Sequence, residues 1–213
     1  MIIDISYPIK QDIAIYPNNP SFSIKKVTDI ECGDNATVSL ITMGTHTGTH
    51  IDAPAHIIPG GLTIDQIPFD RMNGKAKVFD LTGLERITSS DLKQYDIIES
   101  DIILLKTDNS VIWECDRILD NYVTLTYEAA EYMASMHIKM VGIDYMTIEV
   151  PRAKRVAGRS IHKSLLGNDI LICEALKLKD ISEGMYEFSS FPLKIAGADG
   201  CPVRCVVKKL FHL

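Results

Sequence analysis

Short apolar runs rich in valine, isoleucine and leucine recur along the chain, and most of them are bounded by glycine, aspartate, asparagine or proline. This pattern is typical of β-strands. It predicts strands at residues 2–7, 21–30, 36–43, 75–82, 101–106, 140–144, 169–176, 193–196 and 203–209.

Helical spacing of apolar residues is limited to three stretches. The expected helices are residues 91–95 after the cap Ser90, residues 127–137 after the cap Thr126, and residues 161–166 before Gly167. Strands outnumber helices and do not alternate with them regularly. We therefore predict a mixed, strand-rich α/β fold rather than a doubly wound one.

The composition is that of an ordinary globular protein, with 213 residues, 46% hydrophobic and 23% charged. The chain has no internal repeat or linker, so a single domain over residues 1–213 is expected. A net charge of -6 offers no basic stripe for phosphates, which argues against a nucleic-acid partner. No run approaches the roughly 18 apolar residues of a membrane span, so no membrane partner is expected.

The five cysteines are odd in number and form no C-x-x-C pair. This pattern predicts neither a disulfide framework nor a cysteine-based zinc site. The first residues lack the basic region of a signal peptide, and Asp4 interrupts their apolar run. We expect a reduced protein of the cytoplasm.

Three of the six histidines, His46, His50 and His56, fall within one short segment together with Asp52. Imidazole and carboxylate groups suit zinc, manganese or iron. Glycines and Pro54 disfavour a helix, so we predict an extended loop after the preceding strand. There His50 and Asp52 would point to the same side, and Asp52 could bind one ion or bridge two. A polar loop with surface histidines is the alternative, and it explains a single histidine better than the whole set.

Glu174 lies on a predicted strand whose face is otherwise apolar. A buried carboxylate costs several kcal/mol unless a cation accompanies it. The cation could be a metal, shared with His162, or one of the nearby basic side chains. These are Arg152, Arg155, Arg159 and Lys163. From the residues alone, metal site and salt bridge remain equal alternatives.

The segment His46-Thr47-Gly48-Thr49-His50-Ile51-Asp52-Ala53-Pro54-Ala55-His56 resembles the H-x-G-T-H-x-D-x-P-x-H signature of the cyclase family. That family includes bacterial kynurenine formamidase and isatin hydrolase. The resemblance extends over almost the whole chain. It includes residues 3–6, 16–20, 60–68, 141–144 and 198–204.

The resemblance implies a swivelling β/β/α domain with a binuclear zinc site, in which manganese could replace zinc. His46, His50 and Asp52 would hold the first ion. Asp52, His162 and Glu174 would hold the second, and Glu174 would also reach the first. The family also implies a homodimer or homotetramer with substrate-site residues contributed across the interface.

The resemblance further implies amide hydrolysis, in which N-formylkynurenine and water give kynurenine and formate during tryptophan catabolism. The metals would lower the pKa of a bound water to about 7, which generates hydroxide at neutral pH. His56 would act as the acid and base that passes a proton to the departing amine. Tyr16 would bind the substrate, at a position where the formamidases tend to carry a tryptophan. Asn18-Asn19 replaces the usual glycine-aspartate.

Two other classes of function remain open. The first is a related enzyme, which would hydrolyse another cyclic amide or a lactone, as isatin hydrolase does, or act as a cyclase or dehydratase of small metabolites. The second is a metal- or ligand-binding module without turnover. His56 favours an enzyme, because a pure binding site needs no free imidazole beside a full ligand set.

Overall fold

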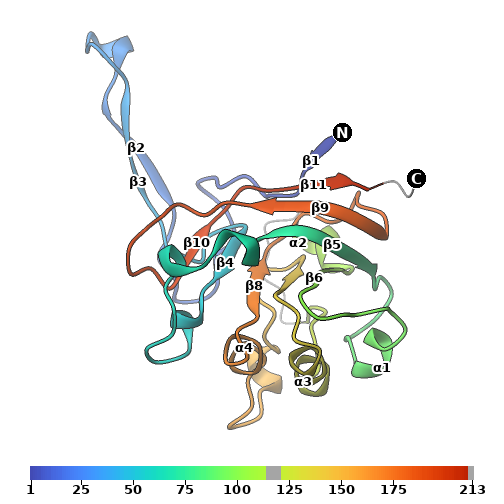
Figure 1. Ribbon diagram of the computed structural model, residues 1–213. Helices are drawn as coiled ribbons and strands as arrows, with labels where there is room; N and C mark the ends of the chain where they lie inside the picture. The colour runs from blue at the N-terminus through green and yellow to red at the C-terminus, as the bar shows by residue number, and fades with distance from the viewer. Residues whose placement is uncertain (114–120, 211–213) are drawn as a thin grey trace.

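A mixed nine-stranded sheet forms the centre of the computed structural model, which describes residues 1–113 and 121–210 (Figure 1). Its strands are β1 (Ile2–Asp4), β4 (His50–Asp52), β5 (Asn73–Asp80), β6 (Ile102–Lys106), β7 (Met140–Ile143), β8 (Leu171–Glu174), β9 (Gly184–Ser190), β10 (Gly200–Pro202) and β11 (Cys205–Lys209). Their order across the sheet is β1-β11-β9-β5-β6-β7-β8-β4-β10. The first and last strands of the chain therefore lie side by side, and β4 enters next to β8.

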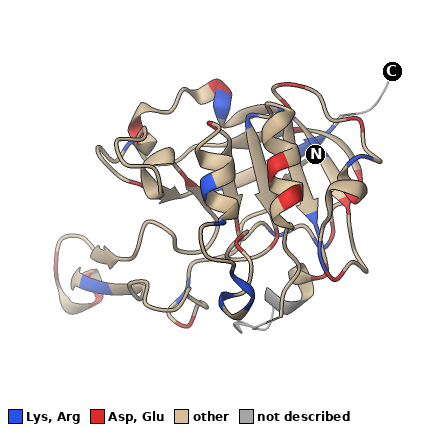
Figure 2. Cartoon of the chain, turned by 90° about the horizontal axis from the view of Figure 1, so that it is seen from below, with Lys and Arg blue, Asp and Glu red and all other residues tan. Residues whose placement is uncertain are grey.

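Strands β5 to β8 pair in parallel, and helices cover one face of this part of the sheet. These helices are α1 (Ser89–Leu92), α3 (Tyr127–Ser135) and α4 (Ile161–Leu166). Ile103 and Val141 of the sheet belong to one buried cluster with Met133 of α3 and Leu165 of α4. These helices also contain acidic and basic residues (Figure 2). The other face of these strands packs in the second buried cluster, which is described next. Both faces of the parallel strands are thus buried, which explains their continuous apolar runs.

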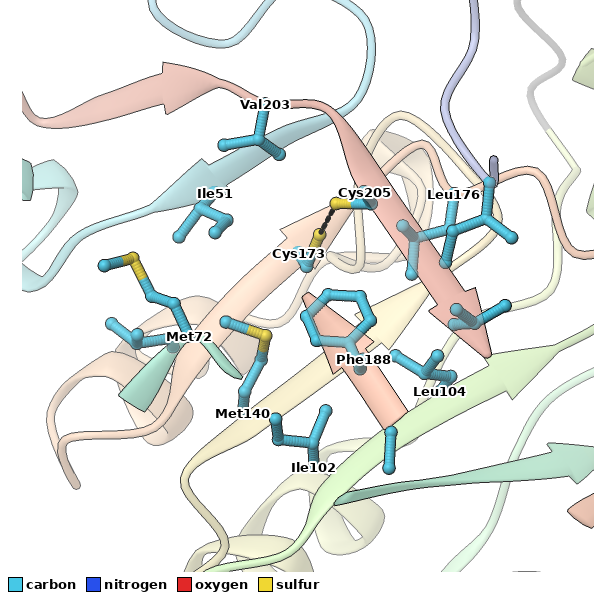
Figure 3. Close-up of a cluster of buried hydrophobic side chains, with 14 of the residues drawn as sticks. Ile51, Met72, Ile102, Leu104, Met140, Cys173, Leu176, Phe188, Val203 and Cys205 are labelled. Carbon is cyan, nitrogen blue, oxygen red and sulfur yellow. Dashed lines mark hydrogen bonds between the residues drawn. The ribbon is translucent and has the colours of Figure 1, made fainter. Parts of the chain in front are cut away.

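A second buried cluster lies on the other face of the parallel strands (Figure 3). Ile102, Leu104 and Met140 point into it, and Phe188 of β9 belongs to the same cluster. The sheet curls, so that β9 and β11 carry residues of the same core. The metal-ligand candidates of β4 and β8 therefore lie on strands that this core anchors, through Ile51 of β4 and Cys173 of β8.

A two-stranded hairpin projects from the body (Figure 1). It consists of β2 (Ser23–Thr28) and β3 (Val38–Thr42), with the short 3₁₀ helix η1 (Ile30–Cys32) at its far end. We call residues 23–42 the arm. Large apolar side chains on it are exposed, including Ile24, Val27 and Leu40.

The observed fold confirms the predicted mixed, strand-rich α/β class. Eight of the predicted strands overlap an observed strand, but the prediction at residues 193–196 is wrong. Leu193 and Ile195 are exposed and belong to no strand, because an apolar run alone does not provide a pairing partner. Strands β4, β9 and β10 were not predicted, since none shows a long apolar run.

The helix predictions are confirmed in two cases and corrected in one. Thr126 caps α3, and α4 has the predicted bounds. The first helix begins at Ser89, so Ser90 is not its cap. Thr88 caps it instead, because its hydroxyl accepts from the amide of Asp91 while the Asp91 carboxylate accepts from the amide of Thr88. A short helix that the sequence analysis missed is α2 (Asn109–Trp113). None of the helices in residues 1–113 and 121–210 has the length and apolar character needed to cross a membrane.

Candidate metal centre

Strand β4 carries two of the predicted ligands. The segment was expected to be a loop throughout, but His50–Asp52 forms a strand that pairs antiparallel with β8 on one side and with β10 on the other. His50 and Asp52 point to the same side, as alternation in a strand requires. His50 Nε2 lies 3.3 Å from Asp52 Oδ1 and 3.4 Å from Glu174 Oε2. These three side chains are buried.

His162 comes from the first turn of α4. Ser160 caps this helix through its hydroxyl, which accepts from the amide of Lys163. The cap directs His162 toward the sheet, where its Nε2 lies 3.5 Å from Asp52 Oδ2 and 3.2 Å from Glu174 Oε1. Asp52 and Glu174 thus each lie between His50 and His162.

Along the chain, His46 comes before β4 and His56 comes after it. His46 Nδ1 is 2.7 Å from Asp52 Oδ1. His56 ends the 3₁₀ helix η2 (Pro54–His56), and its ring centroid is 4.1 Å from that of His46. The side chain of His56 is 32% exposed, compared with 13% for His46. The structure therefore brings the five predicted metal ligands and the predicted catalytic residue His56 together in one site. His56 is the most accessible of its four histidines.

The salt-bridge alternative for Glu174 is wrong within the described residues. There its ion pairs join it to His50 and His162, and none joins it to an arginine or lysine. One carboxylate oxygen, Oε1, also accepts from the amide of Ile148 at 2.6 Å. The nearby basic side chains are engaged elsewhere. Arg155 donates to the hydroxyl of Tyr16, and Arg159 pairs with Glu128.

Opposite charges interact strongly in this buried cluster. Burial lowers the pKa of His50, but the adjacent carboxylates of Asp52 and Glu174 outweigh it and raise this pKa well above the usual value. Burial also lowers the pKa of His162, but the carboxylates of Asp52 and Glu149 raise it well above its usual value. Burial raises the pKa of Asp52, but the adjacent imidazoles of His162 and His46 hold it well below its ordinary value. The carboxylates therefore hold negative charge that favours a cation between them.

The donor set fits divalent metal ions. His50 Nε2 and Asp52 Oδ2 are buried, and no group in residues 1–113 and 121–210 meets either atom in hydrogen-bonding geometry. Buried polar atoms of this kind cost about 1–3 kcal/mol each unless something satisfies them. Ligand atoms of His46, His50 and Asp52 all lie within 4.8 Å of one another, and so do those of Asp52, His56 and His162. Two nitrogens and a shared carboxylate suit the borderline-soft ions that imidazole prefers.

The cluster opens into a cavity of about 240 Å³. Tyr16 and Asn19 line its wall together with Ile57, Met146 and Arg155. The Tyr16 hydroxyl accepts from Arg155 Nη2 at 2.8 Å. Tyr16, predicted to contact substrate, therefore lies at this cavity.

Two carboxylates of the site were missed by the sequence analysis. Glu149 Oε2 is 3.3 Å from His162 Nδ1, and Asp199 Oδ2 is 2.9 Å from His46 Nε2. The sequence does contain a signal for Glu149, because this charged residue lies directly between Ile148 and Val150. Asp199 lies in a stretch whose resemblance was noted without a role being assigned to this residue.

Comparisons with known proteins agree with this geometry. The profile of the Cyclase family matches residues 3–150. Kynurenine formamidase of Bacillus thuringiensis subsp. konkukian (strain 97-27) is 30% identical over 208 residues, which cover 98% of this chain and 97% of the relative.

Solved structures show the same fold. A predicted metal-dependent hydrolase from Bacillus stearothermophilus is 37% identical, with a TM-score of 0.84 and 97% of each chain covered. Isatin hydrolase A from Ralstonia solanacearum has a TM-score of 0.85 at 21% identity, with 97% of this chain and 91% of that one covered. From the extent of the profile match and the full-length similarity to a curated relative, this chain belongs to the cyclase family.

Proposed function

We propose that this protein is a metal-dependent amide hydrolase that cleaves a C–N bond other than a peptide bond. The substrate class is an arylformamide, with N-formylkynurenine and water giving kynurenine and formate in tryptophan catabolism. One observation carries the proposal. His50, Asp52, His162 and Glu174 converge in a buried cluster that opens into a cavity, and the more accessible His56 lines the same cavity. Similarity to kynurenine formamidase over the full chain supports this substrate class.

The cofactor that we propose is zinc, with two ions per chain, and manganese is the alternative. His46, His50 and Asp52 would hold one ion, and Asp52, His162 and Glu174 the other, with Glu174 also reaching the first. Such ions, when bound, lower the pKa of a coordinated water and polarise a substrate carbonyl. Asp52 suits the shared position because its two oxygens face different histidines.

His56 would move the proton. Burial lowers its pKa, which favours the neutral imidazole at neutral pH. A neutral ring can accept a proton from the attacking water and then donate it to the departing amine nitrogen. General acid–base catalysis of this kind contributes roughly 10²- to 10⁴-fold. Nδ1 of His56 faces Asp199, so the other nitrogen, Nε2, would exchange the proton.

Tyr16 would bind the aromatic part of the substrate. The guanidinium of Arg152 lies 5.1 Å from the centroid of its ring, and Arg155 donates to its hydroxyl. These contacts restrain the ring at the cavity wall, where an aromatic substrate could stack against it.

A homodimer, or a homotetramer built from it, is the proposed working form. The arm supports this proposal because its large apolar side chains are more than half exposed, for example Ile24 at 54% and Leu40 at 58%. Large exposed apolar side chains gathered on one projecting hairpin are typical of an interaction site. A second copy could cover both arms at once through one self-complementary interface. The compartment that we propose is the reducing cytoplasm, on the cysteine pattern alone.

The experiment that tests the function couples metal analysis with a substrate panel. The purified protein, loaded with zinc or manganese, is assayed against N-formylkynurenine, isatin, and a set of lactones and simple formanilides. Faster turnover of N-formylkynurenine than of the cyclic amides and lactones supports the proposal. Metal binding without hydrolysis of any member would contradict it and favour a binding module.

A further inference from the structure

The three histidines beside Asp52 do not all turn the same ring nitrogen toward the buried carboxylates. His50 and His162 turn Nε2 toward the two buried carboxylates, as the distances above show. His46 turns Nδ1 toward Asp52 instead. The inner nitrogen of His46 is thus the one closer to its own backbone.

The outer nitrogens of these rings meet three different acceptors. His50 Nδ1 lies 2.8 Å from the carbonyl oxygen of Gly48. His162 Nδ1 faces Glu149, and His46 Nε2 faces Asp199. An acceptor behind a ligand histidine selects the tautomer and restrains the ring, so that the inner nitrogen stays unprotonated. Each ring therefore has an acceptor that selects its inward nitrogen.

Asp199 differs from the other acceptors because it faces two imidazoles. Its Oδ2 lies 2.9 Å from His46 Nε2 and 3.5 Å from His56 Nδ1. Its other oxygen, Oδ1, accepts from the hydroxyl of Thr45 at 2.9 Å. One carboxylate thus connects a candidate metal ligand with the candidate proton carrier.

The backbone around Asp199 is held in place. Its carbonyl accepts from the amide of Ala53, and the carbonyl of Ala198 accepts from the amide of Ile64. The next residue, Gly200, pairs with Asp52 in the sheet. Asp199 is therefore anchored to the strand that carries the shared carboxylate.

We propose that Asp199 is a positioning residue that accepts hydrogen bonds from Nε2 of His46 and Nδ1 of His56. His46 then presents Nδ1 to the metal, and His56 presents Nε2 to the substrate. The part that concerns His56 rests on the proposed hydrolase function, whereas the part that concerns His46 does not.

The first test uses the unaltered protein, loaded with zinc, and ¹⁵N correlation spectra of its histidine side chains. Single-histidine variants assign the signals. The expected spectrum shows His46 protonated at Nε2, and His50 and His162 protonated at Nδ1. Protonation of His46 at Nδ1 would overturn the proposal. This measurement needs neither turnover nor an Asp199 variant.

The second test compares Asp199→Ala and Asp199→Asn with Glu149→Gln and with the exposed control Asp96→Asn. Asp199→Ala should weaken zinc binding at one site about 10- to 100-fold, as loss of such outer partners typically does. At saturating zinc it should also lower kcat more than it changes KM. Asp199→Asn keeps one acceptor oxygen and should fall between Asp199→Ala and the unaltered protein.

The comparison variants distinguish an effect on His162, which faces Glu149, from an effect on the two rings that face Asp199. Glu149→Gln should weaken zinc binding while leaving the nitrogen signals of His56 unchanged, whereas Asp199→Ala should shift those signals. Asp96→Asn should match the unaltered protein. Unchanged zinc affinity and unchanged His56 signals in Asp199→Ala would overturn the proposal. Loss of a whole equivalent of zinc would also overturn it, because Asp199 would then be a ligand. If no amide is hydrolysed, the hydrolase function fails, while the spectra and zinc affinities still decide the role of Asp199.

Discussion

His50 and Glu174 are direct partners in the antiparallel pairing of β4 with β8, and their side chains meet at 3.4 Å between Nε2 and Oε2. The next pair along the ladder, Ile51 and Cys173, points the other way into the buried apolar cluster (Figure 3). One strand pair thus presents ligands on one face and core on the other. A register shift by one residue would exchange the faces, so core packing also holds the metal site in register.

The variants His50→Ala and His56→Ala should separate metal binding from proton transfer. His50 is buried between two carboxylates, so its loss should remove both metal and activity. His56 is more accessible and lies at the cavity, so its variant should keep the metal and lose about 10²- to 10⁴-fold in kcat. Metal content and turnover of both purified variants check this. Equal metal loss in the two would identify His56 as a ligand.

Gly200→Ala should weaken the metal site although it replaces no ligand. A Cβ atom at residue 200 would lie 2.8 Å from Cε1 of the His46 ring and 2.8 Å from the carbonyl oxygen of Ile51. The backbone oxygen cannot move far within the sheet, so the ring of His46 must shift. We expect lower zinc affinity with a nearly unchanged circular dichroism spectrum. Gly83→Ala is a control for destabilisation away from the site, because its Cβ would meet no atom within 4 Å although its φ of +82° strains an alanine there. Zinc affinity equal to that of the control would contradict the prediction.

Asp144 should make stability depend on pH. Burial raises the pKa of this carboxyl from 3.8 to about 6, although Ser110 and Thr107 donate hydrogen bonds to it. Between these pH values the folded protein binds more protons than the unfolded chain. The contribution of Asp144 to the free energy of unfolding therefore falls by about 3 kcal/mol as pH rises from below 4 to above 6.

The variant Asp144→Asn has no carboxyl to titrate at this position. Its stability relative to the unaltered protein should therefore improve by about the same amount across this pH range. Urea unfolding of both metal-free proteins at pH 4 and pH 7.5 measures the difference. Parallel pH profiles for the two proteins would show that folding does not raise the pKa of Asp144.

Leu40→Asp should dissociate the proposed oligomer. Leu40 is 58% exposed on the arm, and an aspartate there would place a charge within the apolar interface. Light scattering coupled to gel filtration should show the smaller species, with little change in the melting temperature. Ile98→Asp is a matched control, because Ile98 is 54% exposed but lies outside the arm. Dissociation by both variants, or by neither, would exclude the arm as the specific contact.

Local patterns in the sequence were sufficient to predict the strands β5 to β8 and the helices α3 and α4. Their apolar runs and caps depend on neighbours along the chain, so they can be read without the fold. The histidine segment was also sufficient to identify His46, His50, His56 and Asp52 as a set, because their residue types and spacing suit metal chemistry.

Strands with short or polar sequences could not be predicted in the same way. β4 and β10 are three residues long and exist because each finds a partner in the sheet. Glu174 illustrates the same limit for the site. Its residues alone left metal and salt bridge equal, and only the family resemblance favoured the metal. The fold then placed Glu174 opposite His50 and directed Arg155 to Tyr16.

The sequence by itself determined which residues supply nitrogen and oxygen ligands, and that a strand-rich core would surround them, because side-chain chemistry and alternation are local properties. Only the tertiary structure decided which ring nitrogen each histidine turns inward and which carboxylates, Glu149 and Asp199, lie behind the rings. These contacts join segments far apart in the chain. They depend on strand register and on the docking of α4, which only the packing of the whole core establishes.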